Sequence, residues 1–319
     1  MIKKIAILTS GGDAPGMNTA VKAVVNTSLT KGFQPYLVYE GYDGLTKGNF
    51  KPVKKEDVKF LSAKGGTDIY SARFPEFAEI EVRKKAVEKM QAEGIDTLVV
   101  IGGDGSYMGA SKLTEMGIKT IGLPGTIDND ISSTDFTIGF HTALNTIVEA
   151  IDKIRDTAES HKRAIVVETM GRHCGDLAIN AAIATGAEVL SVPERKLTEE
   201  EIVQQIKEAR AQGNRSIIVL VTEHMYDVNA LAKKIQDETG VDTRGNVLGH
   251  MQRGGNPVAE DRILASQMSA YAINKLIEGE TGVAVNIVDN KMNTKNILDV
   301  VKMERTSKEE LLKEYDLIK

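Results

Sequence analysis

The sequence contains very little cysteine and few aromatic residues. Its 319 residues include one cysteine, Cys174, no tryptophan and 5% aromatic residues. A single cysteine cannot form a disulfide within the chain, which excludes a disulfide-stapled fold and indicates a reducing compartment. We interpret Cys174 as a small buried hydrophobic residue rather than a reactive thiol.

Long apolar runs and blocks of one charge are also missing. No run approaches the roughly 20 residues that span a bilayer, and the apolar part of MIKKIAILTSGG is too short for a signal peptide. The formal net charge is −5, and Lys and Arg do not gather into a basic arm. We therefore expect a soluble cytoplasmic protein with neither a membrane nor a nucleic acid as partner.

Short β-branched apolar runs recur along the chain, and most are separated by segments of helical period. The predicted strands lie at 5–8, 36–39, 97–101, 120–123, 164–168, 189–192, 217–221 and 283–288. The predicted helices include 82–94, 107–117, 144–157 and 228–240, with capping boxes at Thr198 to Glu201 and Ser307 to Glu310 opening two more. This alternation predicts an α/β fold with a largely parallel sheet and helices on both faces.

Five polar, glycine-rich clusters follow directly after predicted strands. They are TSGGDAPGMN (9–18), GGDGS (102–106), PGTIDND (124–130), MGRHCGD (170–176) and TEH (222–224). Ligands of open parallel sheets bind outside the carboxyl ends of the strands. If all these strands are parallel, the five clusters share one edge, and we expect the site there. Should there be two domains, the break is expected near residue 139, with more than one crossing of the chain.

The first two clusters suit a polyphosphate. Glycine turns at helix starts present backbone N–H groups to an anion, and Asp104 could hold a hard cation such as Mg²⁺ between its carboxylate and phosphates. Ordinary tight turns, with Asp104 as a helix N-cap, are the structural alternative. There is no Walker A lysine and no full G-x-G-x-x-G, so neither a P-loop nor a simple dinucleotide fold is supported.

The third cluster supplies two acids. Asp128 is a candidate general base, and Asp130 could hold the metal or keep Asp128 ionised. An Asx-turn is the alternative, which explains one acid better than two. Among the arginines, Arg172 lies in a glycine cluster at a strand end, where phosphate binding explains it better than solvent display. No pair of histidines has helical metal-ligand spacing, so zinc is not expected.

Taken in order, TSGGDAPGMN, GGDGSYMGA, PGTIDNDI, DTAESHKR, ETMGRHCGD, TEH and GHMQRGG resemble the bacterial ATP-dependent 6-phosphofructokinases over essentially the whole chain. The resemblance implies two Rossmann-like domains. The larger, ATP-binding one would hold 1–138 and about 251–300, and the smaller, sugar-phosphate-binding one 139–250 and about 301–319. The implied reaction transfers the γ-phosphoryl group of MgATP to the 1-hydroxyl of fructose 6-phosphate.

Site residues follow from the matching positions. The ATP-binding positions are Gly12, Arg73, Phe74, Gly103, Asp104, Gly105 and Ser106, with Asp104 at the Mg²⁺ position. Asp128 matches the proton acceptor, with Thr126 and Asp130 beside it, and Arg172 matches the residue that bridges the transferring phosphoryl group and the sugar. The implied sugar-phosphate contacts are Thr126, Ile127, Asp128, Met170, Gly171, Arg172, Glu223, His250, Met251, Gln252 and Arg253. Arg163 and Arg244 match arginines that reach the 6-phosphate from a neighbouring subunit, which implies a homotetramer.

The resemblance is weakest at the effector pocket for ADP or phosphoenolpyruvate. The matching positions are Lys22, Asn26, Lys55, Arg155, Gly186, Ala187, Glu188, Gln212, Asn214, Arg215 and Ser216. Lys22, Asn26 and Lys55 stand where arginine is frequent, and Gln212 and Asn214 where lysine is. Fewer charges and guanidinium forks bind phosphate more weakly, so we expect weak regulation.

The donor is predicted from two glycines. Pyrophosphate-dependent relatives have an acid in place of Gly105 and a lysine in place of Gly125, so this sequence favours ATP. Two alternatives remain, a pyrophosphate-dependent phosphofructokinase and a non-catalytic sugar-phosphate or nucleotide sensor. NAD and diacylglycerol kinases share the GGDG turn but would not explain PGTIDND, MGR and HMQR together.

Overall fold

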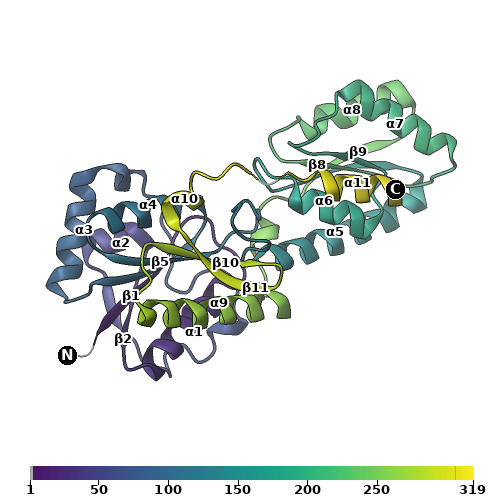
Figure 1. Cartoon of the computed structure of the whole chain (residues 1–319). Helices are drawn as coiled ribbons and strands as arrows, with labels where there is room; N and C mark the ends of the chain where they lie inside the picture. The colour runs from purple at the N-terminus through teal and green to yellow at the C-terminus, as the bar shows by residue number, and fades with distance from the viewer. Residues whose placement is uncertain (1–2, 306) are drawn as a thin grey trace. The chain divides into compact units, whose positions relative to one another are not determined.

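The structure is a computed structural model in which residues 3–305 and 307–319 are described. The chain forms two compact units and passes between them several times (Figure 1). Unit 1 comprises Met1–Ile127, Ile131–Thr142 and Arg253–Arg305, and unit 2 comprises Asp128–Asp130, Ala143–Gln252 and Thr306–Lys319.

Unit 1 contains a seven-stranded sheet in the order β11-β10-β5-β4-β1-β2-β3. The central strands are parallel, while β3 and β11 add antiparallel edges. Buried β-branched residues fill the middle strands, as expected for a sheet covered on both faces. The strands are β1 (Lys4–Thr9), β2 (Gln34–Val38), β3 (Phe50–Pro52), β4 (Thr97–Gly102), β5 (Lys119–Pro124), β10 (Val283–Val288) and β11 (Lys291–Asn296).

Helices cover both faces of this sheet (Figure 1). One apolar core joins alternate strand residues such as Ala6, Leu8 and Leu98 to α2 (Gly41–Lys47), α3 (Ile80–Ala92), α4 (Asp104–Glu115) and α10 (Ile297–Val300). On the other face, α1 (Met17–Thr30) lies beside α9 (Ala259–Glu278). Short 3-10 turns are η1 (Leu61–Ala63) and η2 (Pro75–Ala78).

Unit 2 contains a parallel four-stranded sheet in the order β7-β8-β6-β9. Its strands are β6 (Ala164–Thr169), β7 (Val189–Ser191), β8 (Ile217–Thr222) and β9 (Thr243–Val247). Helices α7 (Glu199–Ala211) and α8 (Val228–Thr239) share one core with the sheet. The remaining elements are α5 (Phe140–His161), α6 (Asp176–Thr185), η3 (Gly249–Arg253) and α11 (Glu309–Ile318). The predicted α/β class with helices on both faces is confirmed.

Every predicted strand is present, but β3, β9 and β11 were not predicted. They are short or largely exposed strands without an apolar pattern. The capping box of α7 is confirmed. The Thr198 side chain accepts from the Glu201 N–H, and the Glu201 side chain accepts from the Thr198 N–H. The second capping box is wrong: α11 begins at Glu309 after Lys308, and Ser307 Oγ accepts from Glu309 N at 3.3 Å instead.

The five glycine-rich clusters do not share one edge of one sheet, so that expectation is wrong. Three of them follow β1, β4 and β5 in the first sheet, and two follow β6 and β8 in the second. An apolar strand pattern does not reveal to which sheet a strand belongs. The main unit boundaries lie after residues 142, 252 and 305, compared with the predicted 138, 250 and 300, and the short segment Asp128–Asp130 also belongs to unit 2.

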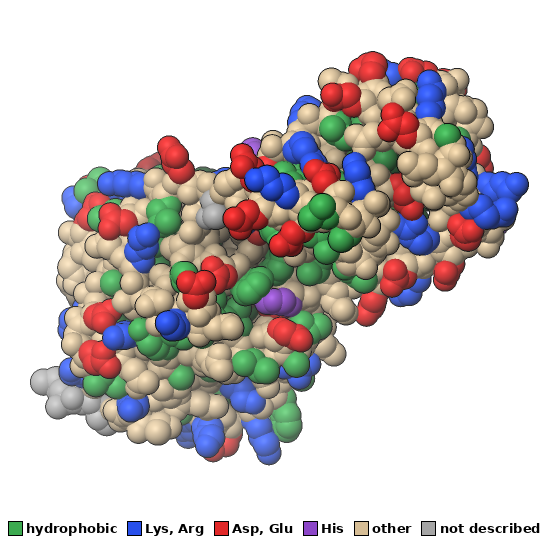
Figure 2. Space-filling model, turned by 45° about the vertical axis from the view of Figure 1, so that its right-hand side comes forward, with side chains coloured by type: hydrophobic (Ala, Val, Ile, Leu, Met, Phe, Trp, Pro, Cys, Tyr) green, Lys and Arg blue, Asp and Glu red, His purple; other side chains and the backbone are tan. Residues whose placement is uncertain are grey.

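Three further findings concern membrane segments, surface charge and the cysteine. No helix within residues 3–305 and 307–319 is long and apolar enough to cross a membrane. Acidic and basic side chains are interspersed over the face shown in Figure 2. Cys174 is a buried free cysteine, as predicted.

Candidate active site

The two glycine turns predicted to bind polyphosphate lie next to each other. They follow β1 and β4, which are adjacent parallel strands with Thr9 opposite Ile101. The chain order changes direction here, since β2 lies on one side of β1 and β4 on the other. Ser10 N donates to Ile101 O at 3.0 Å and ties the two strand ends together. This is the topological switch point at which open α/β sheets bind ligands.

The second turn leads directly into α4. Gly103 is the N-cap, and Asp104 is the first helical residue, so the N-cap alternative for Asp104 is wrong. Its carboxylate is exposed at the positive end of the helix dipole. Within the described ranges no three His, Cys, Asp or Glu side chains form a metal cluster. One exposed carboxylate suits Mg²⁺, which commonly takes one or two carboxylates together with substrate phosphates and water.

The loop carrying Arg73 is tied to the first turn. Ser71 Oγ donates to Gly11 O at 2.7 Å, and Thr9 Oγ1 donates to Tyr70 O at 2.8 Å. Arg73 is exposed, while the half-buried Phe74 packs against the unit 1 core. Sequence analysis missed Ser71, because nothing in the sequence reveals a contact 60 residues away.

Arg253 lies against the same turn. Its Nη1 donates to Asp13 O at 3.2 Å, and a Cβ placed on Gly12 would come within 2.6 Å of that nitrogen. Glycine at 12 therefore leaves room for the guanidinium. Arg253 belongs to unit 1, whereas its sequence neighbours His250, Met251 and Gln252 belong to unit 2.

The PGTIDND segment starts as an ordered extension of β5. Gly125 N donates to Gly102 O at 3.0 Å, and Thr126 N donates to Ile138 O at 3.1 Å. Beyond Ile127, the Asp128 side chain is buried, at 4% exposure, and Asp130 is half-buried. Asn129 has a left-handed φ of 50° and donates its amide to Asp176 Oδ2 at 2.7 Å. The Asn129 amide thus bonds a carboxylate that lies 47 residues away in the sequence.

The clusters after β6 and β8 meet the η3 turn within unit 2. Met170 N donates to Gln252 Oε1 at 3.0 Å, and Arg172 N donates to Glu223 Oε1 at 3.1 Å. Gly171 has a φ of 139°, and Arg172 has a φ of 55°, which is uncommon for a non-glycine residue and typical of functional turns. Met170 to Arg172, Glu223 and Gln252 are thereby brought together, with His250 and Met251 exposed beside them on η3.

Glu168, which the sequence analysis did not single out, lies below this turn. Burial raises the pKa of the Glu168 carboxyl, and the nearby Glu223 carboxylate raises it further. A carboxyl at the end of a buried apolar run was the signal that could have identified it. It places a second acid beside the predicted sugar contact Glu223.

Arg163 and Arg244 are not near this cluster. They lie at the starts of β6 and β9 and share one carboxylate: Arg163 Nε contacts Asp242 Oδ2 at 2.6 Å, and Arg244 Nη2 contacts Asp242 Oδ1 at 3.0 Å. The Arg163 hydrogen bond lowers the pKa of Asp242. Met170 lies seven residues after Arg163, and at a strand's rise per residue the two are about 23 Å apart along β6. Both arginines therefore lie at the amino ends of these parallel strands, whereas the Met170 to Arg172 turn lies at the carboxyl end of β6.

The chain is similar to proteins of known family. The phosphofructokinase family profile matches residues 4–276. The chain belongs to the phosphofructokinase family. Proteins called ATP-dependent 6-phosphofructokinase are 53% identical in Tolumonas auensis, covering 100% of this chain and 99% of the relative, and 54% identical in Vibrio campbellii, covering 94% of each. The resemblance inferred from the motifs is confirmed.

Solved phosphofructokinase structures share the fold. That of Saccharomyces cerevisiae has a TM-score of 0.86 and 40% identity, and covers 94% of this chain but 45% of the yeast chain. A pyrophosphate-dependent phosphofructokinase from Marinobacter aquaeolei has a TM-score of 0.86 at 20% identity, covering 99% of this chain and 92% of that one. At that identity the second likeness concerns the fold alone.

The expected effector positions are divided between the two units. In unit 2, Arg155 contacts Glu188 at 2.8 Å and donates to Gly186 O at 3.2 Å, with Ser216 Oγ at 3.5 Å. Arg215 instead pairs with Glu159 at 3.3 Å. The other unit 2 positions are Ala187, Gln212 and Asn214, and those of unit 1 are Lys22, Asn26 and Lys55. Lys22 Nζ donates to Lys59 O at 2.9 Å.

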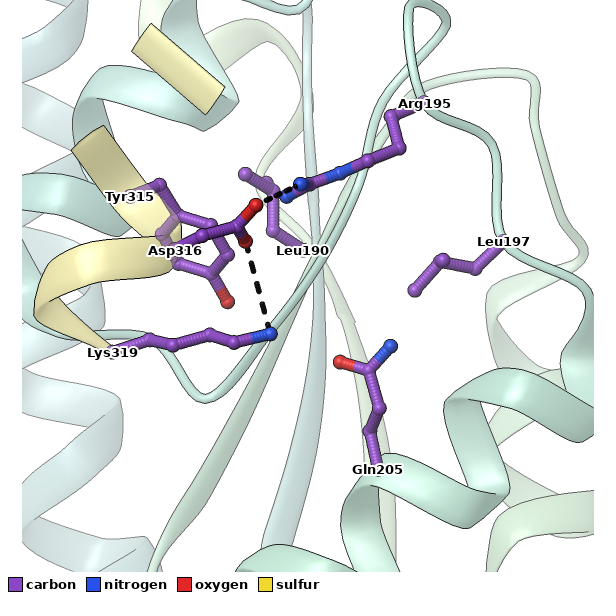
Figure 3. Close-up of a pocket in the computed structure, with 7 residues that line it drawn as sticks. All are labelled: Leu190, Arg195, Leu197, Gln205, Tyr315, Asp316 and Lys319. Carbon is purple, nitrogen blue, oxygen red and sulfur yellow. Dashed lines mark hydrogen bonds and ion pairs between the residues drawn. The ribbon is translucent and has the colours of Figure 1, made fainter. Parts of the chain in front are cut away.

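A cavity of about 300 Å³ lies elsewhere in unit 2 (Figure 3). Its lining consists of Leu190, Arg195, Leu197, Gln205, Tyr315, Asp316 and Lys319. Arg195 and Lys319 both point at Asp316, at 2.6 and 3.8 Å. None of these residues belongs to the predicted active or effector site.

Proposed function

We propose that the chain is an ATP-dependent 6-phosphofructokinase, which transfers the γ-phosphoryl group of ATP to the 1-hydroxyl of fructose 6-phosphate. The single observation that carries this proposal is the identity of 53% to curated proteins of that name over 100% of the chain. An enzyme of glycolysis with one buried cysteine would work in the cytoplasm.

Different residues bind the polyphosphate, stabilise the developing charge and bind the sugar phosphate. The turns at Gly11 to Gly12 and Gly103 to Ser106 bind the polyphosphate through backbone N–H groups. Arg73 and Arg172 offset the charge that develops on the transferring group. Met170, Gly171, Glu223 and the η3 residues hold the sugar phosphate.

Asp128 takes the proton from the attacking hydroxyl, and Thr126 and Asp130 orient the Asp128 carboxylate. Burial of Asp128 supports this role, because it keeps competing water away from the carboxylate. Asp104 would hold Mg²⁺, and Asp130 is the second carboxylate that could bind it. When bound, the ion neutralises charge on the β- and γ-phosphates.

Replacing Asp128 tests the base. Asp128→Ser should lower kcat by about 10²- to 10⁴-fold, the usual effect of a general base, with little change in either KM. A coupled assay for ADP release with fructose 6-phosphate measures it, and repeating the assay with pyrophosphate tests the donor. A kcat near that of the unmodified chain would contradict the role, and absence of turnover with both donors would favour a sensor.

The positions of Arg163 and Arg244 support a shared site. Because both lie across the sheet from the sugar-phosphate cluster of their own chain, they can reach a 6-phosphate only in another subunit. This favours an oligomer, a homotetramer as the family resemblance implies, in which each site borrows arginines.

Regulation by ADP or phosphoenolpyruvate is proposed to be weak. Lys22, Asn26, Lys55, Gln212 and Asn214 supply fewer charges and no guanidinium forks, so a bound phosphate loses contacts. Fructose 6-phosphate saturation curves that stay hyperbolic with micromolar phosphoenolpyruvate are expected. Strongly sigmoidal curves would refute the proposal.

A further inference from the structure

A buried hydrogen-bonded chain joins the C-terminal segment to the middle of PGTIDND. Asp176 Oδ2 accepts two hydrogen bonds, from Asn129 Nδ2 at 2.7 Å and from Lys308 Nζ at 2.8 Å. Asn129 lies between the two acids of the segment, while Lys308 lies 132 residues beyond Asp176, immediately before α11. All three residues belong to unit 2.

The ion pair between Asp176 and Lys308 is buried, so its loss would be costly. The side chains of Asp176 and Lys308 are 3% and 16% exposed. A buried carboxylate that loses its paired cation is strongly destabilised, so the Lys308 ammonium stabilises the Asp176 carboxylate in this position. Charged Asp176 is in turn a stronger acceptor for the Asn129 amide than a neutral group would be.

Asn129 is held at its backbone as well. The Cys174 thiol donates to Asn129 O at 3.8 Å, and the residue is in the left-handed region with a φ of 50°. Asparagine tolerates that conformation better than most residues, but its amide contact fixes which way the peptide groups on either side face. Those peptide groups lead directly to Asp128 and Asp130.

We propose that Lys308 and Asp176 are positioning residues for the phosphoryl transfer, acting through Asn129 on the orientation of Asp128. Neither residue touches substrate in this scheme. Lys308 fixes Asp176, Asp176 fixes the Asn129 side chain, and Asn129 fixes the segment that carries the base. The proposal rests on the base role proposed for Asp128.

A double-mutant cycle in kcat tests the proposal. Lys308→Met and Asn129→Ala should each lower kcat by about 10- to 100-fold, because small misplacement of a reacting group has effects of that size. The KM values for both substrates should stay within about threefold. The kcat of the double variant should lie no more than about twofold below that of the less active single variant, since both changes act through one path. Lys308→Arg, which keeps the charge, should recover most of kcat.

Two controls separate positioning from stability. Lys313→Met removes an exposed lysine from the same C-terminal helix and should leave kcat unchanged. Thr198→Ala removes the cap of α7 in the same unit and should lower the unfolding midpoint without lowering kcat. All variants are assayed at a temperature where circular dichroism shows them folded.

Additive effects of Lys308→Met and Asn129→Ala, or a Lys308→Met variant that unfolds earlier but keeps its kcat within twofold, would overturn the proposal. The Asp128→Ser variant is measured separately. A near-normal kcat there refutes the base, whereas the cycle reports on the Lys308 to Asn129 path itself.

Discussion

At the residue scale, two glycines linked to donor choice differ in their surroundings. A Cβ at Gly105 would meet no atom within 4 Å, so a side chain at 105 fits the protein. A Cβ at Gly125 would lie 2.9 Å from Met17 Cε and 3.1 Å from Ile101 Cγ2. Packing alone thus explains Gly125, and Gly105 is the position where donor choice can be tested without disturbing the fold.

We predict that Gly105→Asp lowers kcat/KM for ATP by about 10- to 100-fold. A carboxylate beside the polyphosphate opposes it by about 1–3 kcal/mol at the effective dielectric of a protein surface. Initial rates at varied ATP measure the effect, with an unchanged urea midpoint as the check on folding. Gly105→Ala is the matched control for volume, and an aspartate variant that uses ATP normally would remove Gly105 from the donor argument.

We predict that Cys174 stays unreactive toward iodoacetamide from pH 7 to 9 in the folded protein and reacts in urea. Burial, followed by the charge of Asp176, raises the pKa of its thiol from 9.0 to about 12. The folded state therefore resists loss of the proton, so this contribution to stability is complete below pH 9 and fades as the pH rises toward about 12. Mass spectrometry of the alkylated chain measures the reaction, and labelling of folded protein at pH 8 would contradict the prediction.

At the element scale, the start of α5 depends on a residue of α9. The first turn of α5 contains no acidic residue, and the buried Asp261 supplies the missing charge from the other helix. Its carboxylate accepts from Gly139 N at 2.9 Å, Thr142 N at 2.7 Å and Thr142 Oγ1 at 2.5 Å. It therefore acts as an N-terminal cap from a distant part of the sequence.

We predict that Asp261→Ala lowers the free energy of unfolding by about 3 kcal/mol, since three donors at a buried helix start lose their acceptor. The same change should lower kcat, because Ile138, just before these donors, pairs with Pro124 and Thr126 at the base of the PGTIDND segment. Urea unfolding followed by circular dichroism measures the first effect. Glu260→Ala, at the exposed neighbouring position, is the control, and equal midpoints for the two variants would contradict the role of Asp261.

At the scale of the whole molecule, the shared site leads to a complementation experiment. Chains with Asp128→Ser lack the base, and chains with Arg163→Ala and Arg244→Ala lack the arginines offered to a neighbour. Refolded together, they should form some sites with an intact base and intact arginines, so activity should exceed that of either chain refolded alone.

Two measurements complete this prediction. Light scattering should give four times the chain mass of 34.6 kDa for each variant, which shows that assembly is retained. If the mixture recovers no activity although mixed oligomers form, the arginines do not serve a neighbouring site.

Much of the fold could be predicted from the sequence because buried parallel strands consist of unbroken β-branched runs. Lys4–Thr9 and Ile217–Thr222 show this, with nearly every residue buried. The exposed strand Thr243–Val247 has no such run and was missed. The site was predictable in outline because its glycines and acids directly follow strands, but the contacts of Ser71, Asp176, Asp261 and Lys308 bridge long stretches of sequence and leave no local pattern.

The sequence by itself determined the fold class, the family and the chemical groups available, since these depend on strand pattern and on motifs in a fixed order. Only the tertiary structure decided how the strands divide into two sheets and that Arg163 and Arg244 lie across a sheet from the turn of their own chain. It also revealed that Lys308 reaches Asn129 through Asp176. These facts depend on which distant segments meet, and pairing across space is a property of the folded chain as a whole.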